Sequence, residues 1–368
     1  MRPFSLLIKP SGPDCNLACR YCFYTDRACI FGQGKHRMSD AVRHKLITDY
    51  MGLNLSPSSF AWQGGEPTLM GLDFYRKVVK HQQKVGRPGQ IVSNALQTNA
   101  VLLDEHWCEF LAEYQWLVGI SLDGPREFHD HYRLDKGQNG TFERVIAAIE
   151  KCRKHQVQFN ILTLLNAKNV KEPDKLFQFF MDLNIKYMQF IPCLEWDEQA
   201  ATIASYAITP DEYGVFLCRI FDLWQDHGYD KVSIRMFDSL LSYILHGKHS
   251  ICTFGQRCDD YIVVEHNGDV FCCDFFVGLD YRLGNIMETP IDQLYHNEVK
   301  RRFARLKRNI NNKCLTCRYK SICLGGCLKD RIVEKNNFSQ PSYFCRAYQK
   351  LFDHALPRLK QIAAHLIQ

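Results

Sequence analysis

Short apolar runs alternate with longer amphipathic stretches over the first half of the chain. The short runs are rich in Val, Ile, Leu and Phe at both odd and even positions, which is typical of strands buried on both faces of a sheet. We predict strands at residues 4–8, 59–62, 90–96, 116–122, 158–164 and 187–191. The stretches between them predict helices at residues 40–51, 72–85, 104–114, 142–154 and 175–183.

Six β/α units in a row predict a parallel sheet, either doubly wound or curled into a partial barrel. The spacing of the units does not choose between these two arrangements. In both, a ligand binds at the carboxyl ends of the strands. Ser39, Asp104 and Thr141 stand where a helix N-cap is expected.

The second half of the chain has less regular alternation. Thr209, followed by Pro210 and Glu212, forms a capping box that predicts a helix ending at Gly228. Asn267-Gly268 predicts a hairpin with a two-residue turn. Because the chain becomes cysteine-dense from about residue 250, we place domains at residues 1–235 and 236–345. Residues 346–368 predict a closing helix, bent or interrupted at Pro357.

Composition excludes several classes of protein. The 368 residues are 46% hydrophobic, which fits neither disorder nor a fibrous repeat. No apolar run approaches the roughly 18 residues of a membrane span. The apolar stretch before Lys9 is too short for a secretory signal, so we expect a cytoplasmic protein without a membrane partner.

The charge pattern does not point to nucleic acid. A net charge of +6 is mild. One basic run, from Lys300 to Arg308, is interleaved with Val299, Phe303 and Leu306 at helical spacing. We interpret it as an amphipathic helix with a solvated basic face, and we expect no nucleic-acid partner.

Cysteine is the unusual component, with 17 residues. In a reducing compartment, clustered thiols hold zinc or iron–sulfur clusters more often than they form disulfides. Cys15, Cys19 and Cys22 lie on one loop after the first predicted strand. Three thiolates would leave one iron of a four-iron cluster open to a ligand, whereas the alternatives are a zinc knuckle or incidental cysteines.

The second predicted strand ends in Gln63-Gly64-Gly65-Glu66-Pro67. Paired glycines allow a ligand to approach the backbone, whose N–H and C=O groups can bind an ammonium or a carboxylate. Alone, this segment is only a turn before a helix.

Eight further cysteines near the carboxyl terminus could form two four-thiolate sites. Either two zinc ions or two iron–sulfur clusters satisfy that count. These cysteines are Cys252, Cys258, Cys273, Cys314, Cys317, Cys323, Cys327 and Cys345.

The Cys15 loop with its following aromatic Phe23, together with the Gly-Gly-Glu-Pro strand end, resembles the radical S-adenosylmethionine (SAM) enzymes. That resemblance implies a partial (β/α)6 barrel of the TIM type. It also implies a [4Fe-4S] cluster on the three cysteines, with its fourth iron bound by SAM.

The later cysteines, with Gly268 five residues before Cys273, resemble the SPASM extension of such enzymes. The resemblance implies two auxiliary [4Fe-4S] clusters, and therefore three clusters in all. The nearer would be held by Cys252, Cys258, Cys273 and Cys327, and the farther by Cys314, Cys317, Cys323 and Cys345. The remaining cysteines are expected to be mostly buried small hydrophobes: Cys29, Cys108, Cys152, Cys193, Cys218 and Cys272.

The whole chain, including Ser5–Pro10, Arg282–Asn285 and Cys273-Asp274-Phe275, resembles the anaerobic sulfatase-maturating enzymes. The resemblance implies that a 5′-deoxyadenosyl radical takes hydrogen from a Cys or Ser of a nascent or unfolded sulfatase, giving Cα-formylglycine. The substrate would be a Cys/Ser-x-Pro/Ala-x-Arg peptide, and flavodoxin or ferredoxin would supply electrons. Asp274 would accept the substrate proton while an auxiliary cluster takes the second electron. The residues implied to contact SAM are Tyr21, Gly65, Ser121, Arg133 and Leu194.

Two of the implied contacts have a simple physical basis. Ser121 ends a strand and can donate to a carboxylate, and Arg133 can pair with the same group. Two alternative functions remain at this point. One is a related radical enzyme that forms thioether or carbon–carbon crosslinks in peptides, and the other is a zinc-ribbon binding module.

Overall fold

The computed structural model describes residues 3–24, 28–332 and 337–367. They form two compact units, each assembled from separate parts of the chain. Unit 1 combines Met1–Ser121, Tyr132–Phe159 and Cys258–Ala304. Unit 2 combines Leu122–His131, Asn160–Arg257 and Arg305–Gln368.

Unit 1 is built on a mostly parallel sheet with the strand order β12-β11-β10-β1-β2-β3-β4. Strands β10 and β1 to β4 run parallel, and β11 and β12 are antiparallel additions at one edge. The strands are β1 (Ser5–Lys9), β2 (Ser58–Trp62), β3 (Val92–Thr98), β4 (Leu117–Ser121), β10 (Tyr261–Glu265), β11 (Asp269–Phe271) and β12 (Arg282–Asn285).

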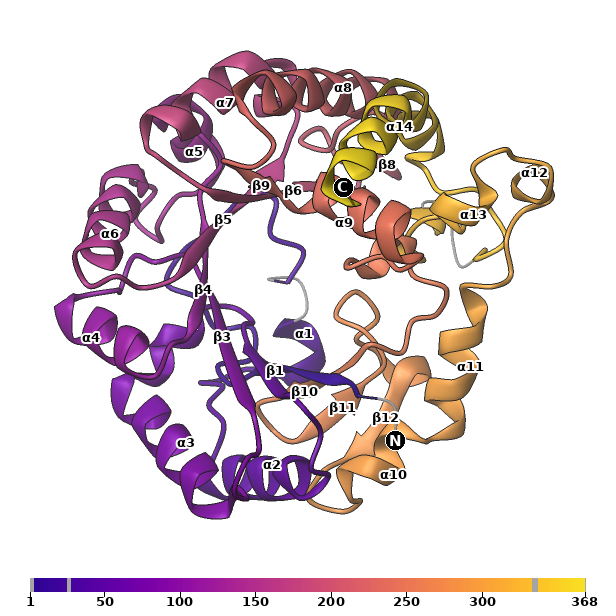
Figure 1. Ribbon diagram of the computed structural model, residues 1–368. Helices are drawn as coiled ribbons and strands as arrows, with labels where there is room; N and C mark the ends of the chain where they lie inside the picture. Colours follow the sequence, from indigo (N-terminus) through magenta and orange to yellow (C-terminus); the bar gives the residue numbers. More distant parts are fainter. Residues whose placement is uncertain (1–2, 25–27, 333–336, 368) are drawn as a thin grey trace. The chain divides into compact units, whose positions relative to one another are not determined.

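Helices cover the outer side of this sheet (Figure 1). The main ones are α2 (Asp40–Gly52), α3 (Leu72–Val85), α4 (Glu105–Glu113), α6 (Phe142–Lys154) and α10 (Ile291–Tyr295). Unit 1 also contains short α1 (Ala28–Phe31), η2 (Pro67–Met70) and η5 (Leu279–Tyr281). The core between α3 and the sheet is aromatic, because Trp62, Tyr75 and Trp116 are fully buried and pack with centroids 5.6 to 6.5 Å apart.

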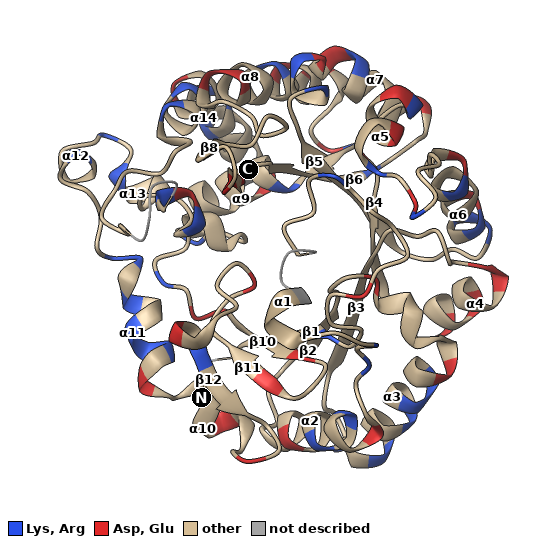
Figure 2. Ribbon diagram, turned by 180° about the vertical axis from the view of Figure 1, so that it is seen from behind, with Lys and Arg blue, Asp and Glu red and all other residues tan. Residues whose placement is uncertain are grey.

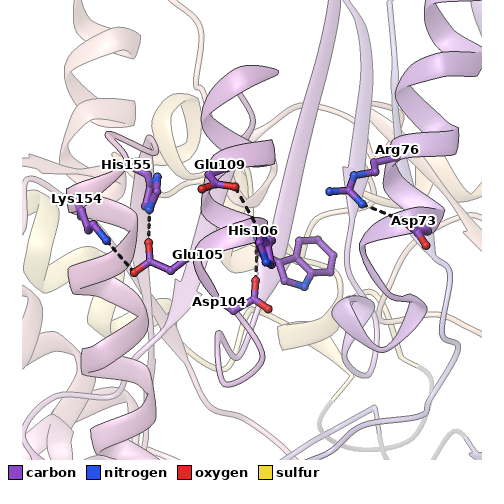
Figure 3. Close-up of polar contacts among 9 residues, drawn as sticks. Asp73, Arg76, Asp104, Glu105, His106, Glu109, Lys154 and His155 are labelled. Atoms are coloured by element: carbon purple, nitrogen blue, oxygen red, sulfur yellow. Dashed lines mark hydrogen bonds and ion pairs between the residues drawn. The ribbon is translucent and has the colours of Figure 1, made fainter.

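Hydrogen bonds at helix ends fix where two of these helices begin. Ser39 accepts from the Val42 N–H, and Asp104 accepts from the Trp107 N–H at 2.9 Å, so both predicted N-caps are confirmed. Figure 3 shows Asp104, with Glu105 beside it reaching Lys154 and His155 at the end of α6.

Unit 2 has a shorter parallel sheet of β5 (Phe159–Leu165), β6 (Tyr187–Pro192) and β9 (Ser233–Ile234), and a small hairpin of β7 (Trp196–Asp197) and β8 (Thr202–Ile203). Helix α14 lies beside α8 (Figure 1), where Tyr213 packs edge-on against Phe344 at 5.1 Å. The helices of unit 2 are α5 (Arg126–Tyr132), α7 (Pro173–Asp182), α8 (Pro210–His227), α9 (Arg235–His246), α12 (Asn312–Leu315), α13 (Lys320–Cys323) and α14 (Cys345–Ile367), with η3 (Asn169–Lys171), η4 (Cys252–Phe254) and η6 (Lys329–Arg331). Helix α11 (Glu298–Leu306) contains the boundary between the units.

The predicted α/β fold with a mostly parallel sheet is confirmed, and the six predicted strands correspond to β1 to β6. The capping box at Thr209 is present. Thr141 stands at the N-cap of α6 as predicted, but its hydroxyl donates to the Arg133 carbonyl and makes no cap hydrogen bond. Helix α14 is not interrupted at Pro357, and its predicted end at residue 368 lies outside the described residues.

The predicted hairpin between β10 and β11 was wrong in its loop length. The register pairs Val264 with Val270, which leaves His266, Asn267 and Gly268 as a three-residue loop rather than a two-residue one. The Gly268 N–H donates to the Glu265 carbonyl, and Gly268 has φ 88°, so the loop is a turn closed by a left-handed glycine. Among the described residues, we find no helix long and apolar enough to span a membrane.

Candidate functional site

The loop after β1 brings three thiols together. The Cys22 N–H donates to the Cys19 carbonyl at 3.1 Å, and the Leu17 N–H points at the Cys15 sulfur at 3.4 Å. Burial raises the pKa of Cys15 to about 12, and negative charge on Glu66, Cys19 and Cys22 acts in the same direction. Thiols that disfavour one another's ionisation need a cation to hold them as thiolates. This donor set fits an iron–sulfur cluster.

The Gly-Gly-Glu-Pro segment after β2 supports this loop directly. The Gly65 N–H donates to the Gly12 carbonyl at 2.9 Å, and the Glu66 N–H donates to the Asp14 carbonyl at 2.8 Å. A Cβ on Gly65 would lie only 2.1 Å from the Asp14 carbonyl oxygen. These two N–H groups are therefore used within the protein, where they hold the segment that precedes Cys15.

Glu66 links the same loop to β3. The carboxylate is 1% exposed and accepts hydrogen bonds from Thr68, the Thr98 hydroxyl and the Asn99 N–H. Burial raises its pKa. The Asn99 amide in turn donates to Asn16 at 2.8 Å and lies 3.7 Å from the Cys15 sulfur. Asn99 directly follows β3, and its place at a strand end is the signal that could have identified it.

Four of the five expected SAM contacts lie in unit 1, and Leu194 lies in unit 2. Ser121 ends β4, and its hydroxyl accepts a hydrogen bond from Gln97 at 3.2 Å, which leaves the hydroxyl hydrogen able to point at a ligand. The Arg133 guanidinium lies 5.5 Å from the centroid of the Tyr21 ring. Tyr21 and Leu194 are buried.

Asp274 lies against two side chains from neighbouring strand ends. Lys9, the last residue of β1, places its ammonium 2.5 Å from one carboxylate oxygen. Gln63, which follows β2, donates to the other oxygen at 3.1 Å. The Lys9 side chain is 2% exposed and that of Asp274 is 13% exposed. The carboxylate is thus held in one orientation in a nearly dry environment.

Two further residues extend this group. The Lys9 ammonium lies 4.4 Å from the centre of the Tyr24 ring, and the Tyr24 hydroxyl donates to both oxygens of buried Glu265 at 2.6 and 2.8 Å. Sequence reasoning missed Lys9, Gln63, Tyr24 and Glu265. Glu265 ends β10, which pairs in parallel with β1 so that Lys9 stands opposite Glu265. The domain boundary predicted from the sequence put β10 in a different domain from β1, so Glu265 was not recognised as a neighbour of Lys9.

Four of the C-terminal cysteines surround a cavity in unit 2. The cavity has a volume of about 480 Å³, and Cys314, Cys317, Cys323 and Cys345 line it. Burial, together with negative charge on the other three thiols, raises the pKa of Cys323 to about 12. The four thiols thus lie around one cavity. They are the four that the resemblance assigns to the farther cluster.

A buried arginine shapes the loop between Cys323 and Cys327. Leu324, Gly325 and Gly326 all have positive φ, at 49°, 79° and 70°. The Arg331 guanidinium, 2% exposed, donates to the carbonyls of Leu324 and Gly325 at 3.0 and 2.9 Å. A single cation thus stabilises a loop in which Leu324 adopts a left-handed conformation that is unfavourable for a residue other than glycine.

The other four C-terminal cysteines are divided between the units. Cys258 and Cys273 belong to unit 1, and Cys252 and Cys327 belong to unit 2. Burial, together with negative charge on Cys258, raises the pKa of Cys273 to about 12. Among the residues described, no three His, Cys, Asp or Glu side chains converge on a single metal ion.

The basic run on and after α11, visible as blue segments in Figure 2, differs from the expectation. Lys300 and Lys307 are each 2% exposed, so the basic residues do not all lie on a solvated face. Lys300 donates to the carbonyls of Cys258, Tyr261 and Cys272 at 2.7 to 3.0 Å. Lys307 donates to the carbonyls of Cys252 and Thr253. The sequence pattern failed because a lysine can bury its charge when main-chain carbonyls receive it.

The cysteines outside these groups are mostly buried, as expected: Cys108, Cys152, Cys193 and Cys272. Cys29 is exposed and Cys218 is partly exposed.

Comparison with known proteins places this geometry in a family. Residues 10–180 match the model of the radical SAM superfamily, and residues 252–318 match that of an iron-sulfur cluster-binding domain, SPASM. The chain is 36% identical to a cysteine-type anaerobic sulfatase-maturating enzyme of Clostridium perfringens, with all of both chains covered. It is 35% identical to a serine-type enzyme of Bacteroides thetaiotaomicron, covering 97% of this chain and 90% of that one.

Solved structures agree with these relatives. Native anSMEcpe with bound AdoMet and Cp18Cys peptide is 36% identical and matches with a TM-score of 0.91, over 99% of each chain. Streptococcus suis SuiB, at 19% identity and a TM-score of 0.67, shares the fold. These matches identify iron–sulfur clusters and SAM as the cofactors and remove the zinc-ribbon alternative. The chain belongs to the anaerobic sulfatase-maturating enzymes, radical SAM oxidoreductases that carry a SPASM extension.

Proposed function

We propose that this enzyme oxidises the β-carbon of a Cys or Ser side chain in a nascent or unfolded sulfatase peptide, and so produces Cα-formylglycine. One observation carries the proposal. Asp274 follows Cys273 in the chain and is held by Lys9 and Gln63, at the strand edge from which the Cys15 loop leaves. The carboxylate that could serve as the base is therefore held in place at this strand end.

When bound, SAM and the clusters supply the 5′-deoxyadenosyl radical that takes one hydrogen atom and the acceptor for one further electron. The chain itself must remove the remaining proton from the substrate sulfur or oxygen. Asp274 is suited to this step because each carboxylate oxygen has two lone pairs, and Lys9 and Gln63 do not use all of them. Lys9 and Gln63 orient the carboxylate, and the burial of Lys9 helps keep bulk water away from it.

Three [4Fe-4S] clusters are part of the proposal. Cys15, Cys19 and Cys22 would bind the one that meets SAM. The cavity formed by Cys314, Cys317, Cys323 and Cys345 supports the farther auxiliary site. Cys252, Cys258, Cys273 and Cys327 would hold the nearer one. Tyr21, Gly65, Ser121, Arg133 and Leu194 would contact SAM.

The organisation of the chain and its electron source complete the proposal. We propose domains at residues 1–235 and 236–345, a C-terminal helix at 346–368, and a flavodoxin or ferredoxin as the electron donor. Identities of 36% and 35% to cysteine-type and serine-type relatives support both substrate types equally. The proposed location is the cytoplasm.

Anaerobic turnover with matched Cys-x-Pro-x-Arg and Ser-x-Pro-x-Arg peptides tests this function. Conversion of Cys to an aldehyde replaces sulfur by oxygen and removes two hydrogens, whereas a crosslink removes two hydrogens and keeps the sulfur. Mass spectrometry separates these products. A crosslinked product, or release of 5′-deoxyadenosine with an unchanged peptide, would contradict the proposed reaction.

The role of Asp274 is tested separately with Asp274→Asn. We expect 5′-deoxyadenosine release to continue while aldehyde formation falls about 100-fold or more, the usual contribution of a positioned base. Asp280→Asn is a matched control because Asp280 is an exposed carboxylate on the same segment. Aldehyde formation at the wild-type rate in Asp274→Asn would remove this residue from the mechanism.

A further inference from the structure

A tyrosine hydroxyl lies against one of the proposed auxiliary-cluster ligands. The Tyr261 oxygen is 3.1 Å from the Cys273 sulfur, within hydrogen-bond distance for sulfur. A cysteine that binds iron does so as a thiolate and has no hydrogen to donate. In the loaded protein, Tyr261 must therefore be the donor and Cys273 the acceptor.

Lys300 places a positive charge in the same region of unit 1. Its ammonium donates to the carbonyls of Cys258, Tyr261 and Cys272 at 2.9, 2.7 and 3.0 Å. Three acceptors at these distances need three N–H hydrogens, which only the charged ammonium has. The charge is 2% exposed and is received by main-chain oxygens.

These two contacts act on the same peptide segments. Lys300 binds the carbonyl of Cys258 and the carbonyl that precedes Cys273, and it also binds the backbone of Tyr261. The backbone at both proposed thiolate ligands of unit 1, Cys258 and Cys273, is thus fixed by one buried cation, Lys300. The phenol that reaches the Cys273 sulfur is fixed by the same cation.

Hydrogen bonds to the sulfurs and nearby net charge are main determinants of the reduction potential of an iron–sulfur cluster. A buried cation and a donated hydrogen bond both stabilise added negative charge, and burial limits screening by water. Both therefore favour uptake of an electron at the site that includes Cys258 and Cys273.

We propose that Tyr261 and Lys300 are positioning residues that raise the reduction potential of the nearer auxiliary cluster, through Cys273 and Cys258. The inference rests on the ligand assignment in the proposed function. In that reaction the substrate loses one hydrogen atom to the 5′-deoxyadenosyl radical, one proton to Asp274 and one electron to this site. Tyr261 and Lys300 make the last transfer favourable.

The test uses full-length protein in which Cys15, Cys19 and Cys22 are replaced by Ala, so that only the auxiliary sites carry iron. In this background, Tyr261→Phe removes the hydroxyl and keeps the ring. Potentiometric titration followed by electron paramagnetic resonance should show one auxiliary potential more negative, with electron uptake disfavoured about tenfold, or about 59 mV. The other auxiliary potential should not move.

Tyr295→Phe is the matched control. Tyr295 also loses one buried hydroxyl bond, to the Asp259 carbonyl at 3.0 Å, but it donates to a main-chain oxygen and not to sulfur. We expect both potentials to be unchanged in this variant. A shift equal to that of Tyr261→Phe would overturn the proposal, because it would show that any lost hydroxyl nearby has the same effect.

Lys300→Met tests the charge, with Lys300→Arg as the variant that retains it. We expect the same direction of shift in Lys300→Met and a smaller shift in Lys300→Arg. Arg301→Met removes an exposed charge from the next position, and the potentials should stay unchanged. If Lys300→Met does not fold, Tyr261→Phe still decides the proposal.

Iron content separates this proposal from the function on which it rests. Each sample should hold about eight irons per chain, four for each fully ligated cluster. A lower iron content in the parent background would contradict the proposed cluster count. Full iron content with unshifted potentials in Tyr261→Phe and Lys300→Met would overturn the role of these two residues and leave the cluster assignment intact.

Discussion

Replacing Lys9 by Met tests whether the contact between Lys9 and Asp274 is a genuine buried ion pair. Met has similar length and no charge, so the change leaves the Asp274 carboxylate without its cation. The two charged groups are 2.5 Å apart, and their side chains are 2% and 13% exposed. Water therefore cannot replace the lost partner without rearrangement of the strand ends.

Removing one partner of a buried pair costs roughly 3–5 kcal/mol. Asp274 keeps its hydrogen bond from Gln63 and a small exposure to solvent, so we expect the low end, about 3 kcal/mol. For a chain of this size that corresponds to a fall in Tm of about 3–6 °C. Asp274→Asn in the Lys9→Met background removes the unpaired charge, so the double variant should recover about 2 kcal/mol of the loss.

The assay is anaerobic thermal unfolding of reconstituted protein with equal iron content in all variants. Arg76→Met is the control because the Arg76–Asp73 pair, seen in Figure 3, has side chains that are 56% and 87% exposed. Such a pair contributes about 0.5 kcal/mol or less. The reasoning is refuted if Lys9→Met shifts Tm no more than this control, or if the effects of Lys9→Met and Asp274→Asn simply add.

Three other changes test separate parts of the structure. Gly65→Ala places a Cβ 2.1 Å from the Asp14 carbonyl oxygen, so the Cys15 loop must move; we expect loss of site-bound iron and of SAM binding, checked by iron analysis and calorimetry. Cys323→Ala should remove about four irons per chain while leaving SAM binding intact, because a fully ligated cluster needs its four thiolates. Burial, with help from His36, lowers the pKa of His266 to about 4. Its contribution to stability is therefore present above pH 6.5 and is lost as the pH falls from 6.5 toward 4. Because His266 is partly exposed, we expect the native protein to lose only about 1–2 kcal/mol of unfolding free energy through this group between pH 7 and pH 4.5. In His266→Phe this part of the pH dependence should be absent, as measured by urea unfolding.

Local patterns predicted most of the elements. The strands β1 to β6 and the caps at Ser39, Asp104 and Thr209 depend on residues that are neighbours in the chain, so their signals survive folding. Thr141 occupies its predicted N-cap position but makes no side-chain cap bond, because its hydroxyl donates to the Arg133 carbonyl. The predicted hairpin loop was one residue too short, because Asn-Gly occurs in hairpin loops of more than one length.

The surroundings of Asp274 could not be predicted in the same way. Recognising Lys9 and Glu265 as neighbours requires knowing that β10 pairs with β1, more than 240 positions earlier in the chain. The charge of Lys300 was assigned to solvent because lysines in a basic run are usually solvated. Its three carbonyl partners, on Cys258, Tyr261 and Cys272, are brought together only by the fold.

The guanidinium of Arg331 has a consequence for how the protein acquires its iron. It donates hydrogen bonds to the carbonyls of Leu324, Gly325 and, at 3.1 Å, Asn309. In many small cysteine-rich modules a bound metal ion holds the loops together instead. The loop between Cys323 and Cys327, which forms part of the cavity wall, is thus held in shape by Arg331, a residue of the chain itself. We expect the polypeptide to fold before the iron–sulfur clusters are inserted into a preformed site. Zinc fingers differ, because they are unfolded without their metal ion.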